Sequence, residues 1–71
     1  MNTSLEINFL QQLVDEQIDV HVFLVSGIKL VGKIGQFDER CVLLRNTISQ
    51  VIYKTAISTV VPQSQIDFAK L

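Results

Sequence analysis

The first part of the chain places its apolar residues at helical spacing. One face of a helix with 3.6 residues per turn would collect Leu5, Phe9, Leu10, Leu13 and Val14. Thr3 and Glu6 have the spacing of a capping box, in which a hydroxyl and a carboxylate satisfy the first free backbone N–H groups. The pattern predicts an amphipathic helix within residues 1–18, mainly over 4–17.

From residue 19 onward, β-branched and aromatic residues replace the helical pattern and favour short strands. Ser26-Gly27 predicts a hairpin turn, and residues 38–40, 46–47 and 54–56 are short connections. Gly32 and Gly35 lie where the alternation of the second strand has to slip, which predicts a bulge or sharp bend. We expect five strands, at residues 20–25, 28–37, 41–45, 48–53 and 57–61.

One helix followed by five short antiparallel strands predicts a mainly β domain over residues 1–62, folded as a small, strongly bent, partly open barrel. Residues 63–71 show no periodicity and are expected to fray as a tail, with Ile66 and Phe68 as the side chains able to dock. The fourth and fifth strands are apolar, and as sheet edges they would need partners.

A chain of 71 residues buries little surface by itself, and a single cysteine, Cys41, cannot form an internal disulfide. Assembly with other copies is therefore favoured. A formal net charge of −1 gives little overall attraction to nucleic acid, so any RNA binding has to depend on a few locally placed cations and on base stacking. Neither a membrane-spanning apolar run nor a signal peptide is evident, and the cytoplasm is the expected compartment.

Catalytic and metal chemistry find no support in the residue pattern. The sequence has no Ser/His/Asp ordering, no carboxylate pair with a plausible pocket and no glycine-rich phosphate loop, so we expect neither an enzyme nor a cofactor. His21 has no second histidine or nearby cysteine, which argues against a metal site. Cys41 lies in an apolar run and is expected to be a small buried hydrophobe.

Four segments of the sequence form a recognisable set: VSGIKLVG at 25–32, Phe37-Asp38, LLRNTISQ at 43–50 and YKTAISTVVP at 53–62. Together they resemble the bacterial Hfq family of Sm-like proteins, which typically has YKHAIS where this chain has YKTAIS. The resemblance implies a homohexameric ring of Sm-like barrels that binds single-stranded RNA and lets small regulatory RNAs meet messenger RNAs, with a role in stress responses. A proximal pore takes uridine-rich ends, a distal face takes adenine-rich repeats, and a rim contacts RNA bodies.

The distal face of the family is the best preserved in this sequence. Phe23 stands where the family stacks adenine on tyrosine, and a phenyl ring keeps the stacking surface. The resemblance implies a distal RNA site made of Phe23, Gly27, Ile28, Lys29, Leu30, Gln50 and Thr59. Val31 replaces a glutamine that helps to select adenine in many members, which changes how the base edge is recognised.

The implied proximal pore and rim differ from the family pattern. The pore would comprise Glu6, Glu39, Arg40, Tyr53, Lys54 and Thr55, where the family has glutamine for the two acids, an aromatic residue for Arg40 and histidine for Thr55. Glu6 would partly neutralise Lys54, so uridine binding is expected to be weak. At the rim Asn46 matches, whereas the helix arginines of many members are replaced by Val14, Asp15 and Gln17.

Two alternatives remain open at this stage. Phe23, Ile28 and Leu30 could be ordinary core residues, and Lys29 and Lys33 a solvated strand face. The ring could also be a divergent paralogue that serves as a structural or protein-interaction module with little RNA chaperone activity.

Overall fold

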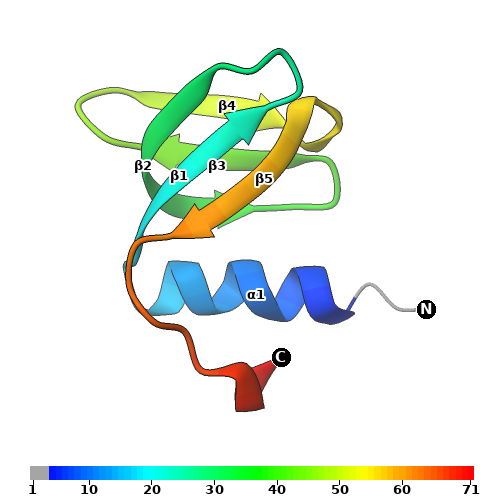
Figure 1. The fold of residues 1–71 in the computed structure, drawn as a ribbon, viewed down its shortest axis with the longest axis vertical. Helices are drawn as coiled ribbons and strands as arrows, with labels where there is room; N and C mark the ends of the chain where they lie inside the picture. The colour runs from blue at the N-terminus through cyan, green and yellow to red at the C-terminus, as the bar shows by residue number, and fades with distance from the viewer. Residues whose placement is uncertain (1–3) are drawn as a thin grey trace.

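The computed structural model describes residues 4–71, in which a five-stranded antiparallel sheet curves over one helix (Figure 1). The elements are α1 (Ser4–Asp15), β1 (Asp19–Leu24), β2 (Lys29–Phe37), β3 (Cys41–Arg45), β4 (Ser49–Tyr53), the 3₁₀ turn η1 (Lys54–Ala56), β5 (Ile57–Pro62) and the 3₁₀ turn η2 (Phe68–Lys70). The predicted helix and five strands are confirmed, with small shifts at their ends. The capping role predicted for Thr3 lies outside the described residues.

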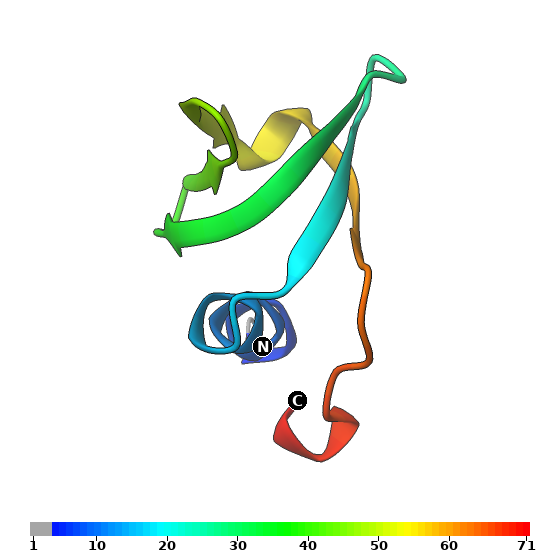
Figure 2. The same ribbon diagram turned by 90° about the vertical axis from the view of Figure 1, so that its left-hand side faces the viewer.

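The long strand β2 organises the sheet, whose order is β4-β3-β2-β1-β5. Its first half pairs with β1 and its second half with β3, and the register shifts between Ile34 and Gln36, around Gly35. This irregularity confirms the predicted bulge and lets β2 cross the molecule from the hairpin to β3, as Figure 2 shows. At Gly32 a Cβ would come within 2.5 Å of the Arg45 carbonyl oxygen, so no side chain fits there. The apolar strands β4 and β5 are the two edges.

The core lies between the concave side of the sheet and α1. Its fully packed members are Leu10, Leu13, Ile18, Val20, Val22, Ile34, Val42, Leu44 and Ile52. On β3, Val42 and Leu44 take the two inward positions, so Cys41 points the other way and is only half-buried. The prediction that Cys41 is a buried hydrophobe is therefore wrong.

The helix α1 ends at Asp15, earlier than predicted, because the chain reverses at Gln17. Gln17 has a φ of 53°, and the N–H groups of Gln17 and Ile18 donate to the carbonyls of Val14 and Leu13 at 3.3 and 3.2 Å. This pair of bonds is a Schellman motif, accompanied by burial of both Leu13 and Ile18 in the core. The motif usually carries glycine at the left-handed position. Because this chain has Gln17 there, the sequence pattern did not indicate where the helix ends.

The C-terminal segment 63–71 lies along α1 and is connected to it by one buried side chain. Gln12 is only 4% exposed, its Nε2 donates to the Asp67 carbonyl at 3.2 Å, and its Oε1 accepts from the Asp67 N–H. Ile66 packs against the core, as the sequence allowed, whereas Phe68 is exposed. Lys70 pairs with Glu16 at 3.4 Å.

Candidate nucleic-acid interface

The convex face of β1, β2 and β5 carries the best-formed part of the predicted distal site. Along β1, Val20 and Val22 face the core, so Phe23 lies on the opposite side of the sheet, where it is half-buried. Phe23 is directly opposite Lys29 on β2 and Thr59 on β5. Residues paired in this way share one face, so the structure brings these three predicted residues together with a phenyl ring in the middle.

The β1–β2 hairpin extends this face with a tight, exposed turn. Gly27 has a φ of 96°, and its N–H donates to the Leu24 carbonyl at 2.9 Å. The Leu24 N–H donates to the Ile28 carbonyl at 2.8 Å, and the side chain of Ile28 is left 56% exposed. An exposed isoleucine at a hairpin tip is not a core residue, so that alternative is wrong for Ile28.

Two predicted distal residues lie elsewhere in the single chain. Leu30 is opposite the buried Val22 and packs against the core, which gives it mainly a packing role. Gln50 lies on β4, opposite the buried Leu44, and β4 is separated from β1 by two strands of the sheet. For Gln50, alternation along the sequence does not reveal this, because the bulge in β2 changes which face of the sheet the residues after it occupy.

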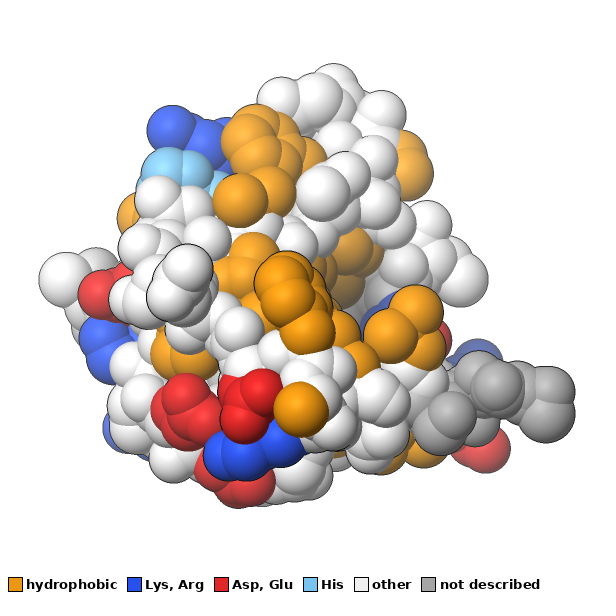
Figure 3. All heavy atoms as spheres, turned by 60° about the horizontal axis from the view of Figure 1, so that its bottom comes forward, with side chains coloured by type: hydrophobic (Ala, Val, Ile, Leu, Met, Phe, Trp, Pro, Cys, Tyr) orange, Lys and Arg blue, Asp and Glu red, His pale blue; other side chains and the backbone are white. Residues whose placement is uncertain are grey.

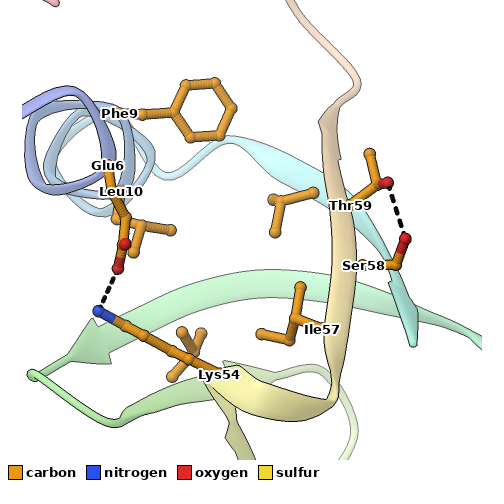
Figure 4. A pocket seen from close by; sticks show the side chains of 9 residues that line it. Glu6, Phe9, Leu10, Lys54, Ile57, Ser58 and Thr59 are labelled. Atoms are coloured by element: carbon orange, nitrogen blue, oxygen red, sulfur yellow. Dashed lines mark hydrogen bonds and ion pairs between the residues drawn. The ribbon is translucent and has the colours of Figure 1, made fainter. Parts of the chain in front are cut away.

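The predicted pore residues gather where α1 meets η1. Lys54 of η1 forms an ion pair with Glu6 of α1, and Figure 4 shows the two side chains pointing toward one another. The Lys54 side chain is only 20% exposed, and its Nζ lies 5.6 Å from the centre of the Phe37 ring. Lys54 is therefore engaged by a carboxylate and an aromatic face before any ligand arrives.

The β2–β3 turn places further acidic and basic groups beside Lys54. The Lys54 N–H donates to the Arg40 carbonyl at 2.8 Å, which joins the turn to η1. A hollow of about 520 Å³ is lined by Glu6, Ile7, Gln11, Phe37, Asp38, Glu39 and Lys54. Three carboxylates, Glu6, Asp38 and Glu39, thus share this hollow with a single lysine. Tyr53 and Thr55 are exposed on either side of Lys54.

Asp38 fixes the conformation of this turn. Its Oδ1 accepts the backbone N–H groups of Arg40 and Cys41, both at 2.8 Å. These two hydrogen bonds, assisted by the positive charges of Lys54 and Arg40, lower the pKa of Asp38 below its usual value of 3.8. The turn that presents Glu39 and Arg40 is consequently stable when Asp38 is ionised.

A second hollow, of about 290 Å³, borders the predicted rim residue Asn46. Its lining comprises Gln17, Asp19, Gly32, Lys33, Ile34, Gly35, Arg45 and Asn46. The Asn46 amide donates to the Val31 carbonyl at 2.7 Å and its oxygen accepts the Ile48 N–H at 3.0 Å, so Asn46 holds the β3–β4 turn. Of the residues that stand in for the family's helix arginines, Val14 packs against the core and Gln17 ends the helix.

Three residues near these sites were not among those predicted to bind RNA. Phe37 lies under Lys54, His21 shares the face of Phe23, and Arg45 borders the hollow beside Asn46. The alternation of β1 was sufficient to place His21 with Phe23, whereas the contact of Phe37 depends on the path of η1. In the described part of the chain, no three potential metal-ligating side chains come together, and no helix is long and apolar enough to cross a membrane.

A helix followed by this open, bent, five-stranded antiparallel sheet defines the chain as an Sm-like protein. The family model described as Hfq protein matches residues 6–67. A 1.55 Å crystal structure of the pleiotropic translational regulator Hfq aligns with a TM-score of 0.82 and 30% sequence identity, covering 89% of this chain and 97% of that chain. A crystal structure of an Hfq protein from Anabaena sp. aligns with a TM-score of 0.81 and 28% identity, covering 86% and 100% respectively.

The chain belongs to the Hfq family. That family consists of RNA-binding, ring-forming regulators and is not a family of enzymes.

Proposed function

We propose that this chain forms a homohexameric ring in the cytoplasm, binds adenine-rich single-stranded RNA on its distal face, and brings small regulatory RNAs to messenger RNAs. The observation that carries the proposal is the row of Phe23, Lys29 and Thr59 on the convex face. It offers a ring for base stacking, an exposed cation for a phosphate and a hydroxyl for hydrogen bonding. A solvated strand face needs no phenylalanine at its centre.

Assembly accounts for the separation of Gln50 from this row. Both β4 and β5 are free edges, and pairing of β4 of one copy with β5 of the next would bring Gln50 close to Thr59 of the neighbour. The distal pocket would then be shared between two subunits. Repetition around a ring also supplies the avidity that a chain of net charge −1 lacks.

The proximal pore of the same ring would bind uridine-rich RNA weakly. Glu6 is already paired with the Lys54 ammonium group, and Asp38 and Glu39 add two further negative charges to the same hollow. A phosphate entering there would have to compete with the Glu6 carboxylate for the lysine and would be repelled by the other two acids. Arg40 offers a flexible cation in place of an aromatic platform.

The experiment that tests the proposal is binding of oligo-A to the intact ring and to Phe23→Ala at fixed salt. Loss of the Phe23 phenyl group should cost about 1–3 kcal/mol of binding free energy per stacked base, with the fold unchanged. Phe68→Ala is the matched control, because Phe68 is an exposed aromatic residue on the tail. Unchanged affinity in Phe23→Ala, with the ring intact, would contradict the proposal.

A structural or protein-interaction ring is the second candidate. The face that carries α1 and the tail mixes acidic and basic side chains, as Figure 3 shows, and includes the Glu16–Lys70 pair. Such a face has no continuous positive track for RNA. Absorbance of the purified ring separates the candidates, since an RNA-binding ring should copurify with nucleic acid that absorbs at 260 nm, and a protein scaffold should not.

A further inference from the structure

The convex face carries a second row of side chains beside Phe23, centred on His21. His21 lies two residues before Phe23 on β1, on the same side of the sheet, and both are half-buried. His21 is directly opposite Val31 on β2 and Val61 on β5. The rows Lys29–Phe23–Thr59 and Val31–His21–Val61 are therefore adjacent and parallel, about 6.5 Å apart along the strand.

The second row has the character of a stacking platform. Val31 and Val61 are 45% and 37% exposed, and together they leave an apolar strip on either side of the imidazole. Within residues 4–71 the imidazole nitrogens of His21 form no side-chain hydrogen bond, so they are available to a ligand. A planar ring set between two valines can stack on a base, and its nitrogens can also bond a base edge.

The charges around His21 suit an RNA backbone passing over both rows. Asp19, the next convex-face residue on β1, is paired with Lys33 of β2 at 2.6 Å, so its negative charge is offset. Lys29, the β2 member of the Phe23 row, is exposed and adds a positive charge. On β5 the facing residues, Thr59 and Val61, are uncharged. Among the described residues 4–71, the convex-face neighbours of His21 on β1, β2 and β5 therefore leave no uncompensated negative charge beside it.

We propose that His21 is a second base-stacking position on each subunit, adjacent to Phe23, so that one subunit holds two successive bases of a single-stranded RNA on β1. This inference rests on the proposed function, because it extends the distal site.

The test compares oligo-A affinity at fixed salt for the intact ring and for His21→Ala, His21→Phe, Phe23→Ala and the control Phe68→Ala. Removal of one stacked base corresponds to roughly a 5- to 150-fold loss of affinity. We expect this loss in His21→Ala and near-full affinity in His21→Phe, which keeps a flat ring. Native mass spectrometry of each variant checks that the ring is intact.

The failure of this inference is distinguishable from failure of the proposed function. If Phe23→Ala loses affinity while His21→Ala binds like the unmodified protein, the distal site stands and His21 is not part of it. An equal loss in His21→Ala and His21→Phe would overturn stacking as the role of His21. If neither Phe23→Ala nor His21→Ala changes oligo-A affinity, both proposals are wrong.

Discussion

Glu6 of α1 and Lys54 of η1 form an ion pair although they are far apart in the sequence. The contact depends on the packing of α1 beneath the sheet, which places the first turn of the helix next to the chain connecting β4 to β5 (Figure 4). The ion pair connects α1 to the residues predicted to line the pore. Whether this ion pair is formed or broken decides whether the Lys54 ammonium group is available to a phosphate.

Removing the carboxylate should release Lys54 for RNA. In Glu6→Gln the amide cannot hold the ammonium as strongly, so oligo-U affinity should rise while oligo-A affinity stays the same. The triple variant Glu6→Gln, Arg40→Phe, Thr55→His should raise oligo-U affinity further, because it also restores an aromatic platform and a donor ring. Fluorescence anisotropy with both oligonucleotides measures the effect. Tight oligo-U binding by the unmodified protein, undiminished in Lys54→Ala, would show that the pore chemistry lies on other residues.

Gln17 should be a site where glycine stabilises the protein. A left-handed conformation costs a residue with a Cβ about 1–2 kcal/mol relative to glycine. Gln17→Gly also loses the bond from Nε2 to the Val14 carbonyl, 3.0 Å long and exposed, so the net gain should be smaller, about 0.5–1 kcal/mol. Chemical unfolding at fixed protein concentration measures it, with Gln11→Gly in the middle of α1 as a control that should destabilise. A less stable Gln17→Gly protein would contradict the Schellman end of α1.

The β2–β3 turn should loosen in acid. Because the pKa of Asp38 is lowered in the folded chain, its ionised form stabilises the turn at pH values above about 3.8, and this contribution is lost as pH falls through the lowered pKa. The amide resonances of Arg40 and Cys41 should therefore titrate with a midpoint below 3.8. Asp38→Ala should remove this transition and increase hydrogen exchange at both amides at neutral pH. A midpoint above 3.8 would contradict the hydrogen-bonded turn.

Edge strands β4 and β5 should pair between copies and close a ring. Native mass spectrometry at micromolar concentration should show a homo-oligomer, with six subunits as the expected number, and little monomer. A charged residue on the edge should weaken pairing, so Val51→Lys is expected to release monomer. The control Lys70→Ala lies on the tail, away from both edges, and should leave the ring intact. A predominantly monomeric spectrum for the unmodified protein would contradict both the ring and the shared distal pocket.

Local patterns were sufficient to predict the elements and the position of Phe23, but not the contacts between distant segments. Alternation along β1 separates Val22 from Phe23, and the glycines of β2 indicate its bend. The end of α1 was hidden because Gln17 adopts a conformation that glycine normally signals. The partner of Gln12 could not be predicted either, since an amide that bonds the backbone of Asp67 leaves no pattern in the sequence. Leu30 and Gln50 were assigned from resemblance, and their facing directions depend on register.

The comparison of oligo-A with oligo-U affinity for the unmodified ring, at one salt concentration and with ring integrity verified, tests the central claim most directly. In the distal row, Lys29 and Thr59 are exposed on either side of Phe23, whereas Lys54 at the pore is engaged by Glu6. We therefore expect oligo-A to bind more tightly than oligo-U, and Phe23→Ala to remove that preference. Equal or tighter binding of oligo-U would contradict the account.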